Sequence, residues 1–170
     1  DANHKPLPEA YKLLAQVRKD WHPETEAASI ALAWRKGWKS DKDGHLKLGQ
    51  CIKAAELQKE FIDYDFVILL NFEVWNEKEF TKEKKIALLD HECCHAGEAV
   101  DKEGEPKVDA KGRRMWRTVS HDVTEFNAII KRHGIWKRDL EHFAEALMEH
   151  KQKSLPFTEA KPAEAAAVVQ

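Results

Sequence analysis

The segment IALLDHECCHA, residues 86–96, contains the pattern H-E-x-x-H at positions 91–95. Residues four positions apart lie on one face of an α-helix, so His91 and His95 can bind the same metal ion. Glu92 is turned aside from that face and can hold a water molecule against the metal. The spacing therefore predicts a helix that carries a zinc site of the hydrolytic kind.

The residues around the motif favour a buried helix over a surface helix with two solvated histidines. Leu88 and Ala87 flank the two imidazoles, so the helix is apolar on nearly every side. The stripe on the other side comprises Ile86, Leu89, Cys93, Ala96 and Val100. Two imidazoles and a carboxylate on a buried face are costly unless they are paired or bind a metal.

The composition describes a nearly neutral chain with room for one domain. Its 170 residues are 34% charged and carry a formal net charge of -2, which provides no general basic field for nucleic acid. No apolar run is long enough to span a membrane, and residues 1–8 lack a signal-like apolar stretch. Cys51, Cys93 and Cys94 make an odd count with two adjacent members, which argues against a disulfide framework. We therefore expect a cytoplasmic protein.

Hydrophobic periodicity predicts an α+β fold, with a short, mostly antiparallel sheet packed on the motif helix and on further helices. The expected domain covers residues 1–153, and the Pro- and Ala-rich residues 154–170 are expected to be a flexible tail. The expected strands are 29–35 and 45–53, joined as a hairpin through 36–44, then 65–75, and a short hairpin within 101–119; residues 54–62 are also compatible with a helix. The expected helices are 9–20, the motif helix from Thr81, one from a Ser120 cap to Gly134, and one through 140–153.

A catalytic zinc ion takes three protein ligands and keeps one position open, so one ligand must come from outside the motif helix. His121 is favoured, because it begins the helix expected after Ser120 and follows a hairpin that could bring it back to the motif. Glu125, one turn further along, is the main alternative, since some zinc enzymes use a helical glutamate. The remaining candidates are Glu98, which lies on the motif helix itself, and His133, His142, His22, His45 and His150, for which solvation is the simpler explanation.

The cysteines and tryptophans of the chain are expected to be packing residues. Cys93 points away from the imidazole face, and Cys94 lies to one side of the metal direction, so both are expected to pack rather than to bind metal. Four tryptophans with apolar neighbours are expected in the core: Trp34, Trp75, Trp116 and Trp136.

Two segments give the chain a more specific resemblance. Residues 91–96 (HECCHA) followed by residues 120–126 (SHDVTEF) resemble the SprT-like zincins, in which a third histidine opens a helix of the H-G-x-x-F type. His121 and Phe126 match that pattern, and Asp122 replaces the usual glycine. Together with residues 65–68 and 88–95, the same segments resemble the Putative phage metallopeptidase family, from about Trp21 to about Phe143. The resemblance implies a small zincin-like or minigluzincin-like metallopeptidase core, encoded by a phage or prophage.

The expected mechanism is zinc-assisted amide hydrolysis. His91, His95 and His121 would hold Zn2+, and Glu92 would take a proton from water and pass it to the leaving amine. The expected substrate is a protein or peptide, which could add to the strand that ends near Trp75 if that strand forms an edge. Three residues are candidate transition-state donors: Tyr64, Arg117 and His133.

Two other functions compete with the peptidase. One is a non-catalytic, metal-stabilised binding module acting on a host protein or on a DNA-bound protein, for which a carboxylate beside the metal would have no use. The other is a protease directed at DNA-bound proteins. That function needs a basic surface, and the only local cluster, residues 111–117, is more simply a solvated hairpin. Neither a membrane nor a nucleic acid is therefore an expected partner.

Overall fold

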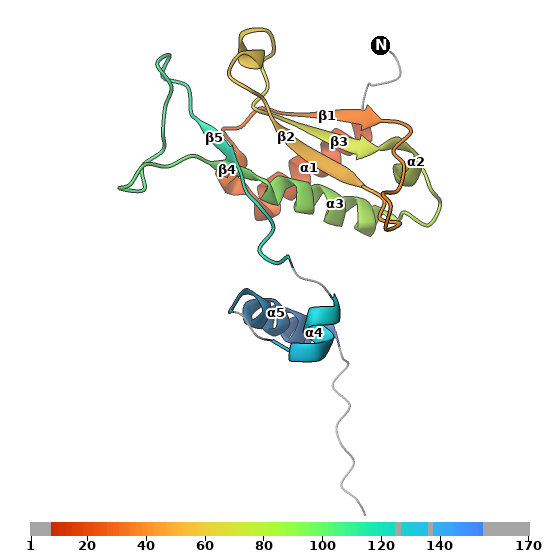
Figure 1. The fold of residues 1–170 in the computed structure, drawn as a ribbon. Helices are drawn as coiled ribbons and strands as arrows, with labels where there is room; N and C mark the ends of the chain where they lie inside the picture. The colour runs from red at the N-terminus through yellow and green to blue at the C-terminus, as the bar shows by residue number, and fades with distance from the viewer. Residues whose placement is uncertain (1–7, 125–126, 136–137, 155–170) are drawn as a thin grey trace, which may run out of the picture. The chain divides into compact units, whose positions relative to one another are not determined.

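The computed structural model describes residues 8–124, 127–135 and 138–154. The chain divides into two compact units, one ending at Ser120 and one beginning at His121 (Figure 1). The first unit contains all of the strands that the structure describes, and the fold is α+β, as expected from the sequence. Within the described parts of the chain, no helix is long and apolar enough to cross a membrane.

The main sheet of the first unit has the strand order β1-β3-β2, formed by β1 (Ile30–Arg35), β3 (Phe66–Asn71) and β2 (Gly49–Lys53). Strand β1 runs parallel to β3, and β2 runs antiparallel to it. The predicted hairpin between residues 29–35 and 45–53 is therefore wrong, because β3 inserts between the two strands. The continuous apolar sequence of β3 explains its central place, since Phe66, Ile68 and Leu70 are fully buried.

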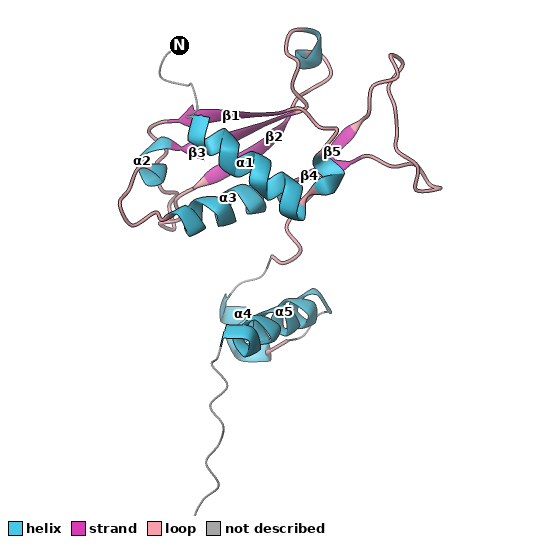
Figure 2. Ribbon diagram, turned by 180° about the vertical axis from the view of Figure 1, so that it is seen from behind, coloured by secondary structure: helices cyan, strands magenta, loops and turns pink. Residues whose placement is uncertain are grey.

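Helices α1 (Pro8–Trp21) and α3 (Lys82–Cys94) pack side by side on one face of this sheet (Figure 2). Their apolar faces and the sheet enclose one core, to which Val17, Leu89 and Cys93 contribute with no exposed surface. Trp34, Trp75 and Trp116 are buried, as predicted, whereas Trp136 lies outside the described residues. The three cysteines form no disulfide.

The strand predicted over residues 65–75 ends at Asn71, where the chain turns into the short helix α2 (Phe72–Trp75). The side chain of Asn71 caps this helix by accepting a hydrogen bond from the Val74 amide at 3.2 Å. The predicted helical character of residues 54–62 is limited to the 3₁₀ turn η3 (Gln58–Glu60). A second 3₁₀ turn, η2 (Pro23–Thr25), follows α1.

The motif helix begins as predicted, with Thr81 as its N-cap, but it ends earlier than expected. His95 is its C-cap, and the chain continues as strand β4 (Ala96–Glu98), which pairs antiparallel with β5 (Trp116–Thr118). Ala96 is buried on that strand, and Val100 is exposed beyond it, so neither belongs to a helical stripe. Within residues 101–119, the predicted hairpin is present as a bridge between Val108 and Arg114 and a hydrogen bond from the Met115 amide to the Lys107 carbonyl oxygen, whereas the partner strand of β5, β4, lies before this range.

The second unit contains helices α4 (Asn127–His133) and α5 (Arg138–Ser154). Helix α4 ends before Gly134, whose φ of +67° suits the residue expected to stop it. The predicted start at a Ser120 cap is wrong, because residues 121–124 are not helical. Phe126 and the tail from residue 155 lie outside the described residues.

Candidate metal centre

The last turn of α3 presents the two motif histidines together. The rings of His91 and His95 lie with their centroids 5.1 Å apart and their planes at 84°, so both can direct a nitrogen to a common point. His91 is exposed and His95 is half-buried. The expectation that both imidazoles lie on a buried face is therefore wrong, and the candidate centre opens to solvent on the His91 side.

Backbone contacts with the chain after β5 fix the orientation of His95. Its Nδ1 lies 2.6 Å from the Val119 carbonyl oxygen, and the Val119 amide donates to the His95 carbonyl oxygen at 2.9 Å. An Nδ1–H that donates to a carbonyl leaves Nε2 as the available ligand atom and holds the ring in place. Gly97 permits this approach, because a Cβ there would lie 2.6 Å from a methyl group of Val119.

The same contacts place the chain that leads to His121. Because Val119 is bonded to His95, His121 follows within two peptide links of that residue. The ligand atoms of His91, His95 and His121 all lie within 4.8 Å of one another, and His121 is exposed. These three nitrogens match the donor number of a catalytic zinc site.

Glu92 is the buried member of the motif, with only 3% of its surface exposed. Strand β2 covers it so closely that a Cβ on Gly49 would lie 2.5 Å from Glu92 Oε1. Burial raises the pKa of Glu92, against the opposing effects of the His95 charge, a hydrogen bond from the Cys51 amide and the charge of Lys47.

The second carboxylate oxygen of Glu92 tests whether the site suits a metal-activated water. Oε2 is buried and has no hydrogen-bond partner among the residues that the structure describes. A buried carboxylate oxygen without a donor is costly, so it indicates a position where a water molecule belongs. With three imidazole donors nearby, the residues present fit a zinc ion with an open position.

Three of the other predicted ligands in the first unit have different partners. Glu98 forms an ion pair with Arg114 at 2.6 Å, His22 contacts Asp90, and His45 lies 3.4 Å from Asp41. Glu125 lies outside the described residues, while His133, His142 and His150 belong to the helices of the second unit.

Cys93 is fully buried in the core, as predicted, and burial raises the pKa of its thiol to about 12, which keeps it protonated. The expectation that Cys94 packs is wrong, because this residue is exposed. Sequence reasoning also missed Gly49, the Cys51 amide and the Val119 carbonyl. Each acts through its backbone, so no side-chain pattern could have identified it.

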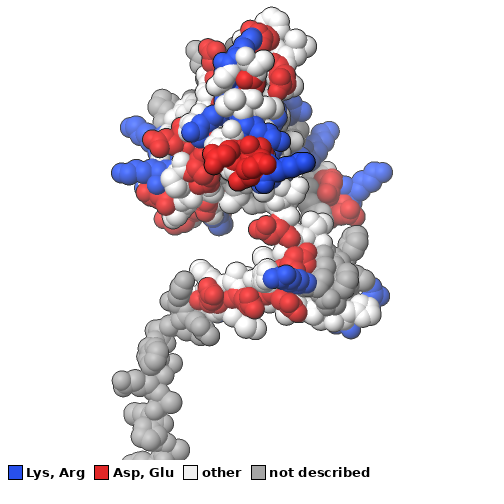
Figure 3. Space-filling model, turned by 90° about the vertical axis from the view of Figure 1, so that its left-hand side faces the viewer, with Lys and Arg blue, Asp and Glu red and all other residues white. Residues whose placement is uncertain are grey.

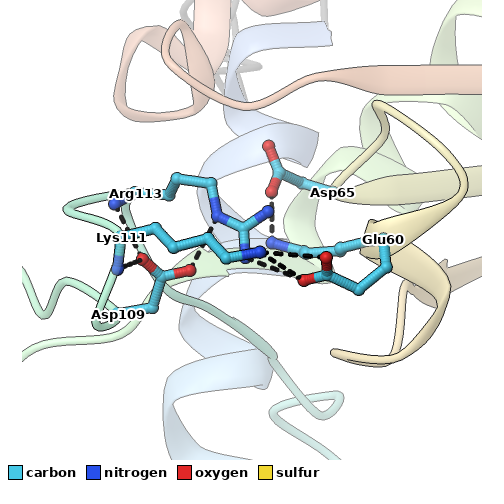
Figure 4. Close-up of polar contacts among 6 residues, drawn as sticks. Glu60, Asp65, Asp109, Lys111 and Arg113 are labelled. Carbon is cyan, nitrogen blue, oxygen red and sulfur yellow. Dashed lines mark hydrogen bonds and ion pairs between the residues drawn. The ribbon is translucent and has the colours of Figure 1, made fainter.

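Three cations of the basic hairpin segment form ion pairs with acidic neighbours: Lys111, Arg113 and Arg114. Lys111 Nζ lies 2.7 Å from Glu60 Oε1, and Arg113 Nε lies 2.7 Å from Asp109 Oδ2 (Figure 4). Acidic and basic side chains also alternate across the face drawn in Figure 3. This arrangement agrees with a solvated hairpin.

Comparison with known proteins gives one match. The sequence model of a family described as Putative phage metallopeptidase matches residues 3–148. No curated protein and no solved structure matches the chain.

Proposed function

Because the chain belongs to the Putative phage metallopeptidase family, we propose that it is a zinc-dependent peptidase of phage or prophage origin that acts in the host cytoplasm. His91, His95 and His121 are the proposed zinc ligands, and Glu92 is the proposed catalytic base. The observation that carries this assignment is the buried Glu92 carboxylate, one residue from His91 and three from His95, whose Oε2 has no hydrogen-bond partner among the described residues.

The environment of Glu92 suits a group that must both accept and donate a proton. Burial raises its pKa toward neutral pH, where a general base and acid works best. The His95 charge, the hydrogen bond from the Cys51 amide to the carboxylate and the Lys47 charge oppose that rise. One oxygen is thus anchored to β2, while Oε2 remains available for water.

The proposed reaction uses these residues in two steps. Zinc, when bound, would acidify the attacking water and polarise the scissile carbonyl. Glu92 takes a proton from the water as its oxygen attacks the carbonyl carbon, and then delivers that proton to the amide nitrogen as the C–N bond breaks. The Val119 carbonyl keeps His95 oriented throughout.

The edge of β2 is the proposed site for an extended peptide. Strand β3 lies between β1 and β2, so it does not meet the condition, set in the sequence analysis, that the strand ending near Trp75 form an edge. The peptide groups along β2 point alternately toward β3 and away from it. The Leu48 carbonyl oxygen and the Ala54 amide form hydrogen bonds on the β3 side. The peptide groups that point away therefore belong to Gly49, Cys51 and Lys53. A peptide added there would run past Glu92, which accepts the outward Cys51 amide.

The test combines metal analysis with proteolysis. The intact chain and Glu92→Gln are purified, their zinc content is measured, and each is incubated with a bacterial lysate whose new peptide termini are identified by mass spectrometry. We expect equal zinc content and loss of the new termini in Glu92→Gln, because the substitution removes the base and keeps the ligands. Identical cleavage by both proteins would refute the peptidase assignment. The absence of cleavage by either, with zinc retained, would favour the metal-stabilised binding module.

A further inference from the structure

Helix α3 carries a second pair of metal-binding side chains, one residue ahead of the first. Asp90 and Cys94 are four positions apart, like His91 and His95, but they lie about 100° around the helix axis from that pair. His22, which directly follows α1, meets them there. The ligand atoms of His22, Asp90 and Cys94 all lie within 4.8 Å of one another.

His22 is held in an orientation that suits a ligand. It is 7% exposed, with Nδ1 3.2 Å from Glu24 Oε1 and Nε2 2.7 Å from Asp90 Oδ1. A carboxylate on one ring nitrogen with the other nitrogen directed at a further donor is the usual environment of a metal-binding histidine. Glu24 thus occupies the outer position, and Nε2 faces Asp90 and Cys94.

The loop that carries His22 is fixed by backbone hydrogen bonds. The Thr25 hydroxyl donates to the His22 carbonyl oxygen at 2.8 Å, and the His22 amide donates to the Arg18 carbonyl oxygen at 3.0 Å. The Arg18 guanidinium in turn donates to the carbonyl oxygens of Thr25 and Ala28. Since these contacts order the loop, a metal ion would meet a largely preformed ligand set.

We propose that His22, Asp90 and Cys94 form a second site for a divalent transition metal, with zinc as the preferred ion. One imidazole nitrogen, one carboxylate oxygen and one thiolate suit Zn2+ or Co2+, whereas Mg2+ and Ca2+ require oxygen ligands. Binding displaces the thiol proton of Cys94 and the proton shared by His22 Nε2 and Asp90 Oδ1, both of which pass to solvent.

This site differs from the H-E-x-x-H centre in what it can do. Its ligands join the end of α1 to the last turn of α3, so a bound ion would clamp the two helices that cover the sheet. The same helical turn carries His91 and His95, so the clamp would also steady the histidines of the first centre. We assign the second ion a structural role, because its ligand set includes no carboxylate placed to activate a water.

The test uses cobalt, because a thiolate ligand gives Co2+ a charge-transfer absorption band in the near ultraviolet that imidazole and carboxylate do not give. The full-length chain is produced in cobalt-supplemented medium as four proteins: the wild type, His91→Ala/His95→Ala, the same double variant with Cys94→Ala, and the same double variant with Cys51→Ala. Cys94 is exposed, so its replacement should not disturb packing, and Cys51 provides the matched thiol control. Circular dichroism confirms that each protein is folded.

We expect two cobalt ions in the wild type and one in the double variant, with the thiolate band present in both. Adding Cys94→Ala should remove the band and the remaining ion, whereas adding Cys51→Ala should remove neither. A double variant with no thiolate band, or with a band that survives Cys94→Ala, would overturn the second site. A thiolate band seen only in the wild type would instead place Cys94 on the motif ion. If instead the H-E-x-x-H centre binds no metal, the wild type would bind one cobalt ion and the double variant would retain that ion.

Discussion

Replacing Gly49 by alanine should place a methyl group against the proposed base. The new Cβ would lie 2.5 Å from Glu92 Oε1, 3.0 Å from Cδ and 3.1 Å from Cγ. Ordinary van der Waals contact begins at 3.4 Å, so the carboxylate must retreat by about 0.9 Å. The end of a flexible side chain can move that far, but it must leave its place beside the water to do so.

The expected loss of activity follows from this displacement of the Glu92 carboxylate. A misplacement of about 1 Å in a reacting group can cost about 100-fold in rate, or about 2.7 kcal/mol of transition-state stabilisation. The folding free energy should change much less than the barrier to the reaction. Weakening the Cys51 amide hydrogen bond lowers the free energy of unfolding by about 1 kcal/mol. Replacing glycine by alanine raises it by about 0.4–1 kcal/mol, because alanine reduces the conformational entropy of the unfolded chain. We therefore expect a change in folding free energy of about 1 kcal/mol or less.

The assay measures initial cleavage rates on a defined peptide mixture, zinc content and chemical denaturation for the same preparations. Ile52→Ala is the matched control, because this exposed residue lies on the same strand and points to the opposite face from Gly49. We expect the control to keep its activity and Gly49→Ala to lose about 100-fold with zinc retained. Full activity in Gly49→Ala, or a loss that simply tracks unfolding, would refute the placement of Glu92 against β2.

Three further outcomes are expected. In metal-free protein, the raised pKa of Glu92 means that its ionisation opposes folding. The wild type should therefore lose stability relative to Glu92→Gln as the pH rises above about 4.3, the ordinary glutamate pKa. The loss should level off once the carboxyl group has ionised in the folded state. Denaturation in chelator at a series of pH values checks this, and a constant difference between the two proteins would contradict it. Gly97→Ala should displace Val119, whose carbonyl oxygen holds His95. The zinc affinity, measured in a competition titration, should fall about 10- to 100-fold. An unchanged affinity would show that this carbonyl is dispensable. His121→Ala should lower zinc affinity at least as much, while the control His142→Ala should not, and equal affinities in the two variants would remove His121 from the ligand set.

The sequence predicted the elements that depend on local periodicity and caps. The motif helix begins at Thr81 and the last helix covers its expected range, because a capping hydroxyl and a 3.6-residue apolar repeat are properties of neighbouring residues. Strand β3 was also predictable, although its end was not. Asn71 stops it by a side-chain cap, which interrupts an apolar pattern that continues to Trp75.

Pairing and burial depended on contacts that the sequence does not encode locally. Residues 29–35 and 45–53 suggested a hairpin because they are adjacent strands with a polar turn between them, but β3 is more apolar and takes the central position. In the motif, apolar residues on nearly every side of the helix suggested that the histidines are buried. The structure buries Glu92 instead, because β2 with its glycine packs against that side of the helix.

Strand β2 explains why one carboxylate in this charged chain acquires properties that its neighbours lack. Asp90 and Glu92 are two positions apart on the same helix, so the local sequence does not distinguish the environments of their carboxylates. Asp90 faces α1 and contacts His22, whereas Glu92 faces β2, where the effect of burial on its pKa outweighs the His95 charge, the Cys51 amide hydrogen bond and the Lys47 charge. Opposite sides of one helical turn therefore carry residues of the two proposed sites, the proposed base Glu92 on the β2 side and the proposed ligand Asp90 on the α1 side. If both assignments hold, α3 positions two metal ions through one rigid turn, and loosening α1 at His22 should reduce activity without touching any group of the first centre.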